Sequence, residues 1–105
     1  MIIGMTTVSS EEEANKISRT LVHEGLAACV NVLGKMKSFY KWRGKIEESI
    51  EYLLIIKTTE NQKEKLLNRI KQLHSYELPE IIFLEVKDGY EEYLSWVSEN
   101  VNQGS

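Results

Sequence analysis

The sequence has little of what marks secreted, membrane-spanning or nucleic-acid-binding proteins. Its single cysteine, Cys29, excludes an internal disulfide, and one free thiol is typical of a reducing compartment. No apolar run approaches the roughly 18 residues that span a bilayer, and the first residues lack the basic region and cleavage site of a signal peptide. Thirteen Lys and Arg against sixteen Asp and Glu disfavour a phosphate-backbone partner. These absences predict a cytoplasmic protein with neither a nucleic-acid nor a membrane partner.

The chain is long enough for one folded domain and no more. It has 105 residues, of which 42% are hydrophobic and 28% charged, as in ordinary globular proteins. A length below about 150 residues leaves no room for a second core. We therefore expect a single domain over residues 1–105.

Hydrophobic periodicity predicts seven elements in the order β-α-β-β-α-β-α. The predicted strands cover residues 2–8, 27–40 with a bend at Gly34, 50–56 and 80–86, and the predicted helices cover residues 10–24, 59–73 and 90–101. The patterns Ser10-x-x-Glu13 and Thr59-x-x-Gln62 predict capping boxes at two helix starts, and residues 102–105 are expected to form a frayed tail. The first six elements form a ferredoxin-like split βαβ arrangement of the α+β class, an antiparallel sheet with helices on one face.

Two predicted strands are apolar on both faces. Residues 52–56 and 81–84 carry an aromatic or aliphatic side chain at every position, so both sides of these strands need cover. The helices of this fold cover only one side. A second layer must come from elsewhere in the chain or from another copy of it.

The predicted hairpin is longer than the helix layer beneath it. An extended segment 27–40 spans roughly 40 Å, whereas helix 10–24 spans about 22 Å. The overhang carries Phe39, Tyr40 and Trp42 towards its tip, where an aromatic patch would be exposed. We therefore expect a closed homo-oligomer with these three residues at its interface. The alternative is a monomer whose terminal helix folds over the second face.

The loop before the fourth strand contains the best candidates for chemistry. His74, Tyr76, Glu77 and Glu80 lie within seven residues, in a loop that contains Pro79. An imidazole beside carboxylates binds a divalent cation or moves a proton. We predict that His74 and Glu77 are metal ligands and that Tyr76 and Glu80 line a cleft. The alternative is that His74 is only a cation at a helix C-terminus.

Motifs for nucleophilic catalysis and phosphate binding are missing. The sequence contains no Gly-x-Ser-x-Gly elbow, no Gly-x-Gly-x-x-Gly and no P-loop. We expect no catalytic residue, and an acid–base enzyme that uses His74 remains only as an alternative.

Several motifs in order along the chain give a family resemblance. They are Leu26-Ala27-Ala28-Cys29-Val30-Asn31, Tyr40-x-Trp42-x-Gly44-Lys45, Leu54-Ile55-Ile56-Lys57-Thr58, His74-x-Tyr76-Glu77-x-Pro79-Glu80 and Tyr93-Leu94-x-Trp96. In these segments the chain resembles the divalent-cation tolerance (CutA) family from about Met5 to Asn100. The resemblance implies a ferredoxin-like homotrimer akin to the PII proteins, with strands paired between subunits. It also implies a role in the response to copper or other divalent metal ions, without an established enzyme activity.

The resemblance also implies a metal site, which this sequence matches in part. Some family members are credited with copper ligands from a Cys at the end of the first strand and from one or two His before the Tyr-Glu-x-Pro segment. Here Thr6 and Leu73 occupy two of those positions, and Ser75 replaces the usual proline. Of the family's ligand positions, His74 is the one that this sequence keeps. Cys29 lies in the matching Ala-Ala-Cys-Val segment, and the simpler interpretation is that it is a core residue. The expected ligand set for copper or another divalent cation is therefore His74, Cys29 and Glu77; the alternative is a structural or small-ligand-binding trimer.

Overall fold

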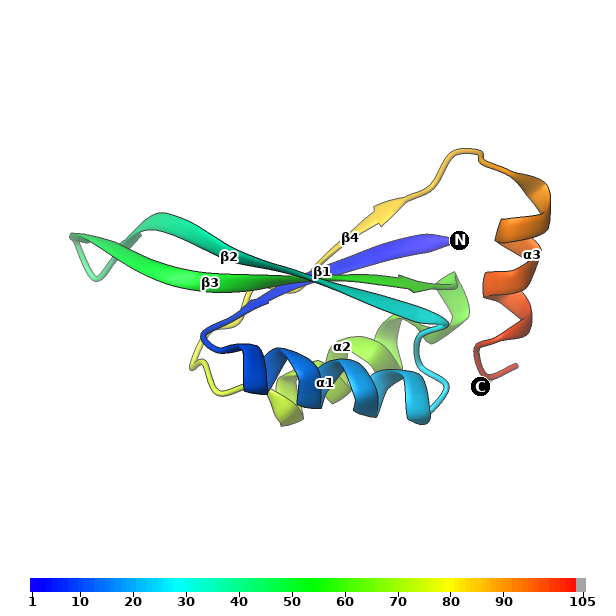
Figure 1. The fold of residues 1–105 in the computed structure, drawn as a ribbon, viewed down its shortest axis with the longest axis horizontal. Helices are drawn as coiled ribbons and strands as arrows, with labels where there is room; N and C mark the ends of the chain where they lie inside the picture. Colours follow the sequence, from blue (N-terminus) through cyan, green and yellow to red (C-terminus); the bar gives the residue numbers. More distant parts are fainter. Residues whose placement is uncertain (104–105) are drawn as a thin grey trace.

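The computed structural model describes residues 1–103, and within them four strands form one antiparallel sheet. The strands are β1 (Ile2–Val8), β2 (Cys29–Trp42), β3 (Lys45–Thr58) and β4 (Ile82–Glu85), in the order β2-β3-β1-β4. The helices are α1 (Glu11–His23), α2 (Lys63–Leu73) and α3 (Glu91–Glu99), and a short 3₁₀ turn, η1 (Glu60–Gln62), precedes α2. The predicted element order and the ferredoxin-like α+β fold are confirmed (Figure 1).

One predicted capping box forms in part and the other does not. Ser10 Oγ accepts the N–H of Glu13 at 3.1 Å, so α1 begins where predicted. The Glu13 carboxylate does not turn back to Ser10; instead it accepts the N–H and hydroxyl of Ser75 from the distant loop. At the second position Thr59 bonds to Asn61, and Gln62 is buried with its Nε2 donating to Asn102. The side chain of Gln62 thus serves tertiary packing and does not cap α2.

The expected frayed tail is wrong at its first residues. The N–H of Asn102 donates to the carbonyl of Gly25 at 2.9 Å, and its Nδ2 donates to the carbonyl of Glu24 at 2.8 Å. Gly25 has a φ of 73°, and a Cβ there would lie 2.2 Å from Oδ1 of Asn102, so glycine is required at this corner. Residues 104 and 105 lie outside the described part of the chain.

The hydrophobic core lies between one face of the sheet and helices α1 and α2. Both helices lie on that face in Figure 1. In each helix the apolar residues recur at helical spacing and form one stripe. This stripe packs on the alternate side chains of β1 and β3 that point towards the helices. Fully buried members of this core are Val8, Ala14, Ile17, Leu21, Ala27, Leu54, Ile56, Leu66 and Ile70.

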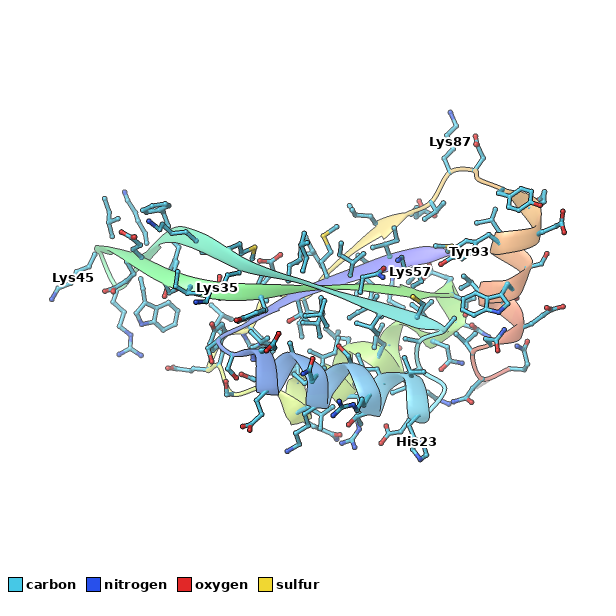
Figure 2. All side chains as sticks on the ribbon, in the orientation of Figure 1. His23, Lys35, Lys45, Lys57, Lys87 and Tyr93 are labelled. Carbon is cyan, nitrogen blue, oxygen red and sulfur yellow. The ribbon has the colours of Figure 1, made fainter. Side chains whose placement is uncertain are left out.

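In the described part of the chain, no helix lies over the opposite face of the sheet. Directly paired residues share a face, and Met5 pairs with both Ile55 and Ile82 on the uncovered side. Leu33, Ile82 and Leu84 on this face are 59%, 46% and 50% exposed. Side chains stand on both faces of the sheet, while α3 lies beyond its end (Figures 1 and 2). The alternative in which the terminal helix folds over this face is therefore wrong.

The β2–β3 hairpin overhangs the rest of the molecule. β1 ends at Val8, which pairs with Tyr52, so residues 45–51 of β3 have a partner strand on one side only. Arg43 and Gly44 both have positive φ, 52° and 81°, which makes the tip a type I′ turn. The molecule measures 44 × 26 × 22 Å, and the hairpin accounts for the long axis (Figure 1).

The predicted bend in β2 is confirmed. The register of β2 against β3 shifts between Leu33 and Met36, on either side of Gly34. A Cβ at Gly34 would lie 2.1 Å from the ring of Tyr52, so the aromatic ring packs directly on this glycine.

Among the described helices none is long and apolar enough to cross a membrane.

Candidate functional site

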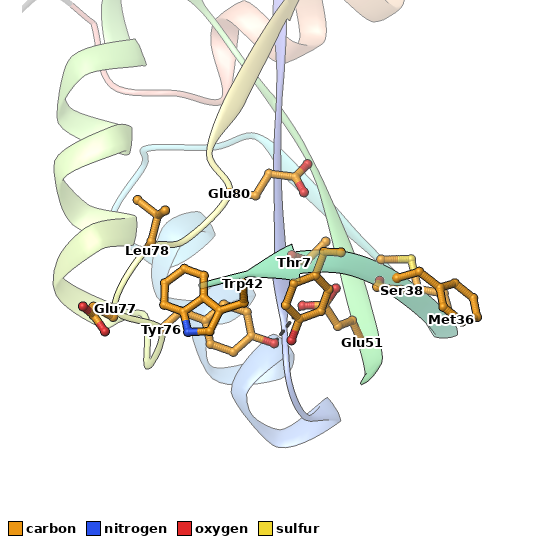
Figure 3. A pocket seen from close by; sticks show the side chains of 11 residues that line it. Thr7, Met36, Ser38, Trp42, Glu51, Tyr76, Glu77, Leu78 and Glu80 are labelled. Atoms are coloured by element: carbon orange, nitrogen blue, oxygen red, sulfur yellow. Dashed lines mark hydrogen bonds between the residues drawn. The ribbon is translucent and has the colours of Figure 1, made fainter. Parts of the chain in front are cut away.

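A cleft of about 590 Å³ lies along the overhanging hairpin, from Glu51 at its base to Trp42 next to the tip turn. Its walls come from the hairpin, from the end of β1 and from the loop that joins α2 to β4 (Figure 3). The lining residues are Thr7, Met36, Ser38, Phe39, Tyr40, Trp42, Glu51, Tyr76, Glu77, Leu78 and Glu80. The loop lies alongside β3 beyond the point where β1 has ended.

This cleft brings together two groups of residues that the sequence suggested separately. Tyr76 and Glu80, which were expected to line a cleft, do line it, and Glu77 is beside them. Phe39, Tyr40 and Trp42, which were expected at an oligomer interface, form the facing wall. The site therefore combines the loop and the hairpin.

Thr7 and Glu51 at the floor of the cleft were missed by sequence reasoning. Glu51 is only 7% exposed although it carries a carboxyl group, and Thr7 is equally buried. One feature of the sequence could have pointed to Glu51. It comes directly before the apolar run 52–56, and strand alternation places its side chain on the same face as Leu53 and Ile55. An acid on that face is a candidate for function because its burial needs a compensating interaction.

Tyr76 supplies that interaction. Its hydroxyl donates to Oε2 of Glu51 at 2.7 Å, as the dashed line in Figure 3 marks. Burial raises the pKa of Tyr76, and the hydrogen bond to Glu51 raises it further. The phenol thus stays neutral and donating, and the floor of the cleft carries the negative charge of Glu51.

His74 is behind the cleft and not in its lining. Its side chain is fully buried, its Nε2 lies 2.7 Å from the carbonyl of Thr7, and its Nδ1 accepts the N–H of Tyr76 at 3.1 Å. Because Nδ1 accepts a hydrogen bond, the ring proton is assigned to Nε2, which donates to Thr7. Oε2 of Glu13 is 3.8 Å from Nδ1. Both ring nitrogens are therefore used to fix the loop against β1, and neither faces the cleft.

The three predicted metal ligands are not brought together. Cys29 pairs with Lys57, which pairs with Ile3 on β1, four residues and about 13 Å along the strand from Thr7 and His74. Within residues 1–103 no three His, Cys, Asp or Glu side chains form a cluster that could hold a metal ion. His74, Cys29 and Glu77 of one chain therefore do not fit a shared copper or zinc centre.

Cys29 and Glu77 have other surroundings than expected. Cys29 was interpreted as a core residue, but it is half-buried and its register places it on the helix-free face with Lys57. Glu77 forms an ion pair with Arg43 at 3.3 Å across the mouth of the cleft, with both side chains largely exposed. An exposed pair of this kind contributes little to stability, but it does link the loop to the hairpin tip.

The chain is similar over nearly its whole length to proteins of one family. The sequence model described as "CutA1 divalent ion tolerance protein" matches residues 2–100. "Divalent-cation tolerance protein CutA" of Thermus thermophilus is 47% identical over 98 residues, which cover 93% of this chain and 95% of that protein. "Protein CutA, chloroplastic" of Arabidopsis thaliana is 38% identical over 91% of this chain and 53% of its own length. A solved Thermus thermophilus structure, "Divalent cation tolerance protein (Cut A1)", covers 97% of this chain and 100% of its own, with 45% identity and a TM-score of 0.94.

The first prediction concerns His74. His74→Ala removes both hydrogen bonds and leaves a buried carbonyl and a buried N–H unpaired, so the free energy of unfolding should fall by about 2–4 kcal/mol. Urea denaturation at fixed protein concentration measures this. His23→Ala, at the exposed end of α1, is the control and should change it by less than about 0.5 kcal/mol. Calorimetric Cu²⁺ titration of the folded proteins should give the same isotherm for both variants and the parent; loss of copper binding in His74→Ala alone would contradict this assignment.

The second prediction concerns Tyr76. Tyr76→Phe leaves the buried Glu51 carboxylate without its donor and should lower the free energy of unfolding by roughly 1–3 kcal/mol at pH 7. Because folding raises the pKa of Tyr76 above its unfolded value of about 10, the stabilisation is complete below that pH and is lost as pH rises further. The difference between parent and variant should therefore narrow from about pH 10 upward. Tyr93→Phe is the control, and an equal loss in both variants would refute the special role of Tyr76.

Proposed function

The chain belongs to the CutA1 divalent ion tolerance protein family, and on this basis we propose that it acts as a homotrimer in the response to divalent metal ions. In this proposal the trimer holds a small ligand or cation in clefts completed between subunits, it is not an enzyme, and it is cytoplasmic. The description of the family and the name of the Thermus thermophilus relative refer to cation tolerance and not to a reaction. The lone thiol of Cys29 supports a reducing compartment.

The observation that carries the proposal is the uncovered apolar face of the sheet. Leu33, Ile82 and Leu84 are exposed there, and β2 and β4 are open edges that present unpaired backbone groups. A soluble monomer seldom leaves such a face in water. Cyclic association of identical copies covers the face and closes the edges together. The number three comes from the resemblance to CutA and PII proteins.

The position of the cleft supports a site that a neighbouring copy completes. Phe39 and Leu78 line it and are 66% and 72% exposed, so the apolar rim is open on the side of the hairpin. The same hairpin carries the interface residues in this proposal. A subunit that closes on the hairpin would narrow the cleft and shield its acidic floor from water.

Two narrower functions have less support from the geometry. Copper bound by His74, Cys29 and Glu77 of one chain would need ligands that lie far apart, and Cu(I) favours the thiolate of Cys29, which is distant from the cleft. An acid–base enzyme based on His74 would need an imidazole nitrogen in the cleft, whereas both nitrogens are hydrogen-bonded behind it. A cation in this site would instead meet the carboxylates of the cleft.

The third prediction tests the assembly. In sedimentation equilibrium at micromolar concentration, the mass of the parent protein should be three times the chain mass of 12.2 kDa. Ile82→Lys, on the helix-free face, should shift the measured mass towards that of the monomer, because association would bury a charge at the interface. Val22→Lys is the matched control, since Val22 on α1 is 44% exposed against 46% for Ile82. A parent mass of one chain would refute the trimer.

The fourth prediction tests the response to metal ions. In bacteria that lack their own copy of this protein, expression of the parent chain should raise the Cu²⁺ concentration that halves growth. Val22→Lys should do the same, and Ile82→Lys should not, provided that both variants accumulate to the parent level. If the parent gives no more tolerance than the empty vector, the role in metal response is wrong even where the trimer is found.

A further inference from the structure

The charged side chains that line the cleft are all acidic. Of its eleven lining residues three are glutamates, Glu51, Glu77 and Glu80, and the lining contains no Lys, Arg or His. Arg43 neutralises Glu77 from outside the lining, through an exposed ion pair of 3.3 Å. Among residues 1–103, the neutral hydroxyl of Tyr76 is the only hydrogen-bond partner of the Glu51 carboxylate, which is buried at the floor. An anionic ligand would thus meet a buried like charge, and a cationic ligand would compensate it.

The floor also has polar atoms that residues 1–103 leave without a hydrogen bond. Glu51 uses Oε2 for Tyr76, and no described residue donates to its Oε1. Thr7 is 7% exposed, its carbonyl is bound by His74, and its Oγ1 hydroxyl has no hydrogen-bond partner in the described part of the chain. Both side chains belong to the lining. These two oxygens open on one cavity beside the buried part of Glu51, and they fit a group with several N–H donors.

The walls of the cleft distinguish an organic cation from a metal ion. Phe39, Tyr40 and Trp42 line one side, and Met36 and Leu78 complete an apolar surface around the acidic floor. Aromatic and aliphatic walls of this kind bury the apolar body of an organic cation whose charged end lies on the acidic floor. A hydrated divalent metal ion would gain nothing from these walls, and the lining holds no imidazole or thiolate.

From these observations we infer that the cleft binds a small organic ammonium compound, with its N–H₃⁺ group on Glu51 and Thr7 and its apolar body between the hairpin aromatics and Leu78. The inference rests on the proposed function only in taking this cleft as the ligand site. The expected ligand has one primary ammonium group on an apolar body, and it is small enough to fit a cleft of about 590 Å³.

Three probes of one size test the sign of the charge. Benzylammonium, benzyl alcohol and benzoate share a ring and differ in their polar group, and each is titrated by calorimetry into the assembled protein at pH 7. Benzylammonium should bind at least tenfold more tightly than benzyl alcohol, and benzoate should bind most weakly. Equal affinity for benzylammonium and benzyl alcohol, or tighter binding of benzoate, would overturn the inference.

Variants test the location of the site. Glu51→Gln should weaken benzylammonium binding at least tenfold, whereas Glu64→Gln, which makes the same charge change on the exposed face of α2, should leave it within twofold. Trp42→Ala, at a position that is 36% exposed on the hairpin, should weaken binding severalfold in samples that keep the oligomeric mass of the parent. This variant replaces Glu51→Gln as the test if Glu51→Gln does not fold. An equal effect of Glu51→Gln and Glu64→Gln would refute the assignment.

The oligomeric mass of the same samples separates the two proposals. A trimer that binds none of the three probes would contradict this inference and leave the proposed assembly standing. A monomer that binds benzylammonium in the predicted order would support the inference and refute the assembly.

Discussion

The constraint on which this molecule depends is a sheet with apolar side chains on two faces and helices on one. Helices α1 and α2 bury Leu54 and Ile56 on the inner face, while Leu53, Ile55, Ile82 and Leu84 face the other way. Strand alternation makes it impossible for one helix layer to shelter both sets. Thr7 and Glu51, at the floor of the cleft, lie on this second face, which the chain does not cover for itself.

His74 determines how the cleft is built although it contributes no atom to its lining. One nitrogen holds the carbonyl of Thr7 on β1 and the other holds the N–H of Tyr76 in the loop. Glu13 at the start of α1 binds Ser75 in the same loop. The loop is thereby fixed to both β1 and the start of α1, which lie more than 60 residues earlier in the chain, and Tyr76 is directed towards Glu51. A histidine in a loop next to acidic residues, which suggests a ligand site, here has a positioning role.

Local patterns predicted the fold well because periodicity reports which side of each element is buried. Residues 52–56 and 81–84 indicated both the sheet and its uncovered face, and Gly34 marked the bend in β2. The errors arose where a side chain has a distant partner. Glu13 and Gln62 fit capping patterns, but their partners are Ser75 and Asn102, many residues away. The sequence also could not show that the predicted metal ligands lie apart, because only the strand register places Cys29 two strands across the sheet and four residues along it from Thr7.

Thr7 takes part in two sets of contacts. Its backbone carbonyl accepts a hydrogen bond from the imidazole of His74, and its side chain lines the cleft. A ligand that binds the hydroxyl of Thr7 therefore also restrains the backbone of Thr7, to which His74 of the loop is hydrogen-bonded. By thermodynamic linkage, occupancy of the cleft would suppress the local opening of the segment around Tyr76. The amide of Tyr76, which is bonded to Nδ1 of His74, would then exchange with solvent deuterium more slowly, so a single backbone proton would report whether the cleft is filled.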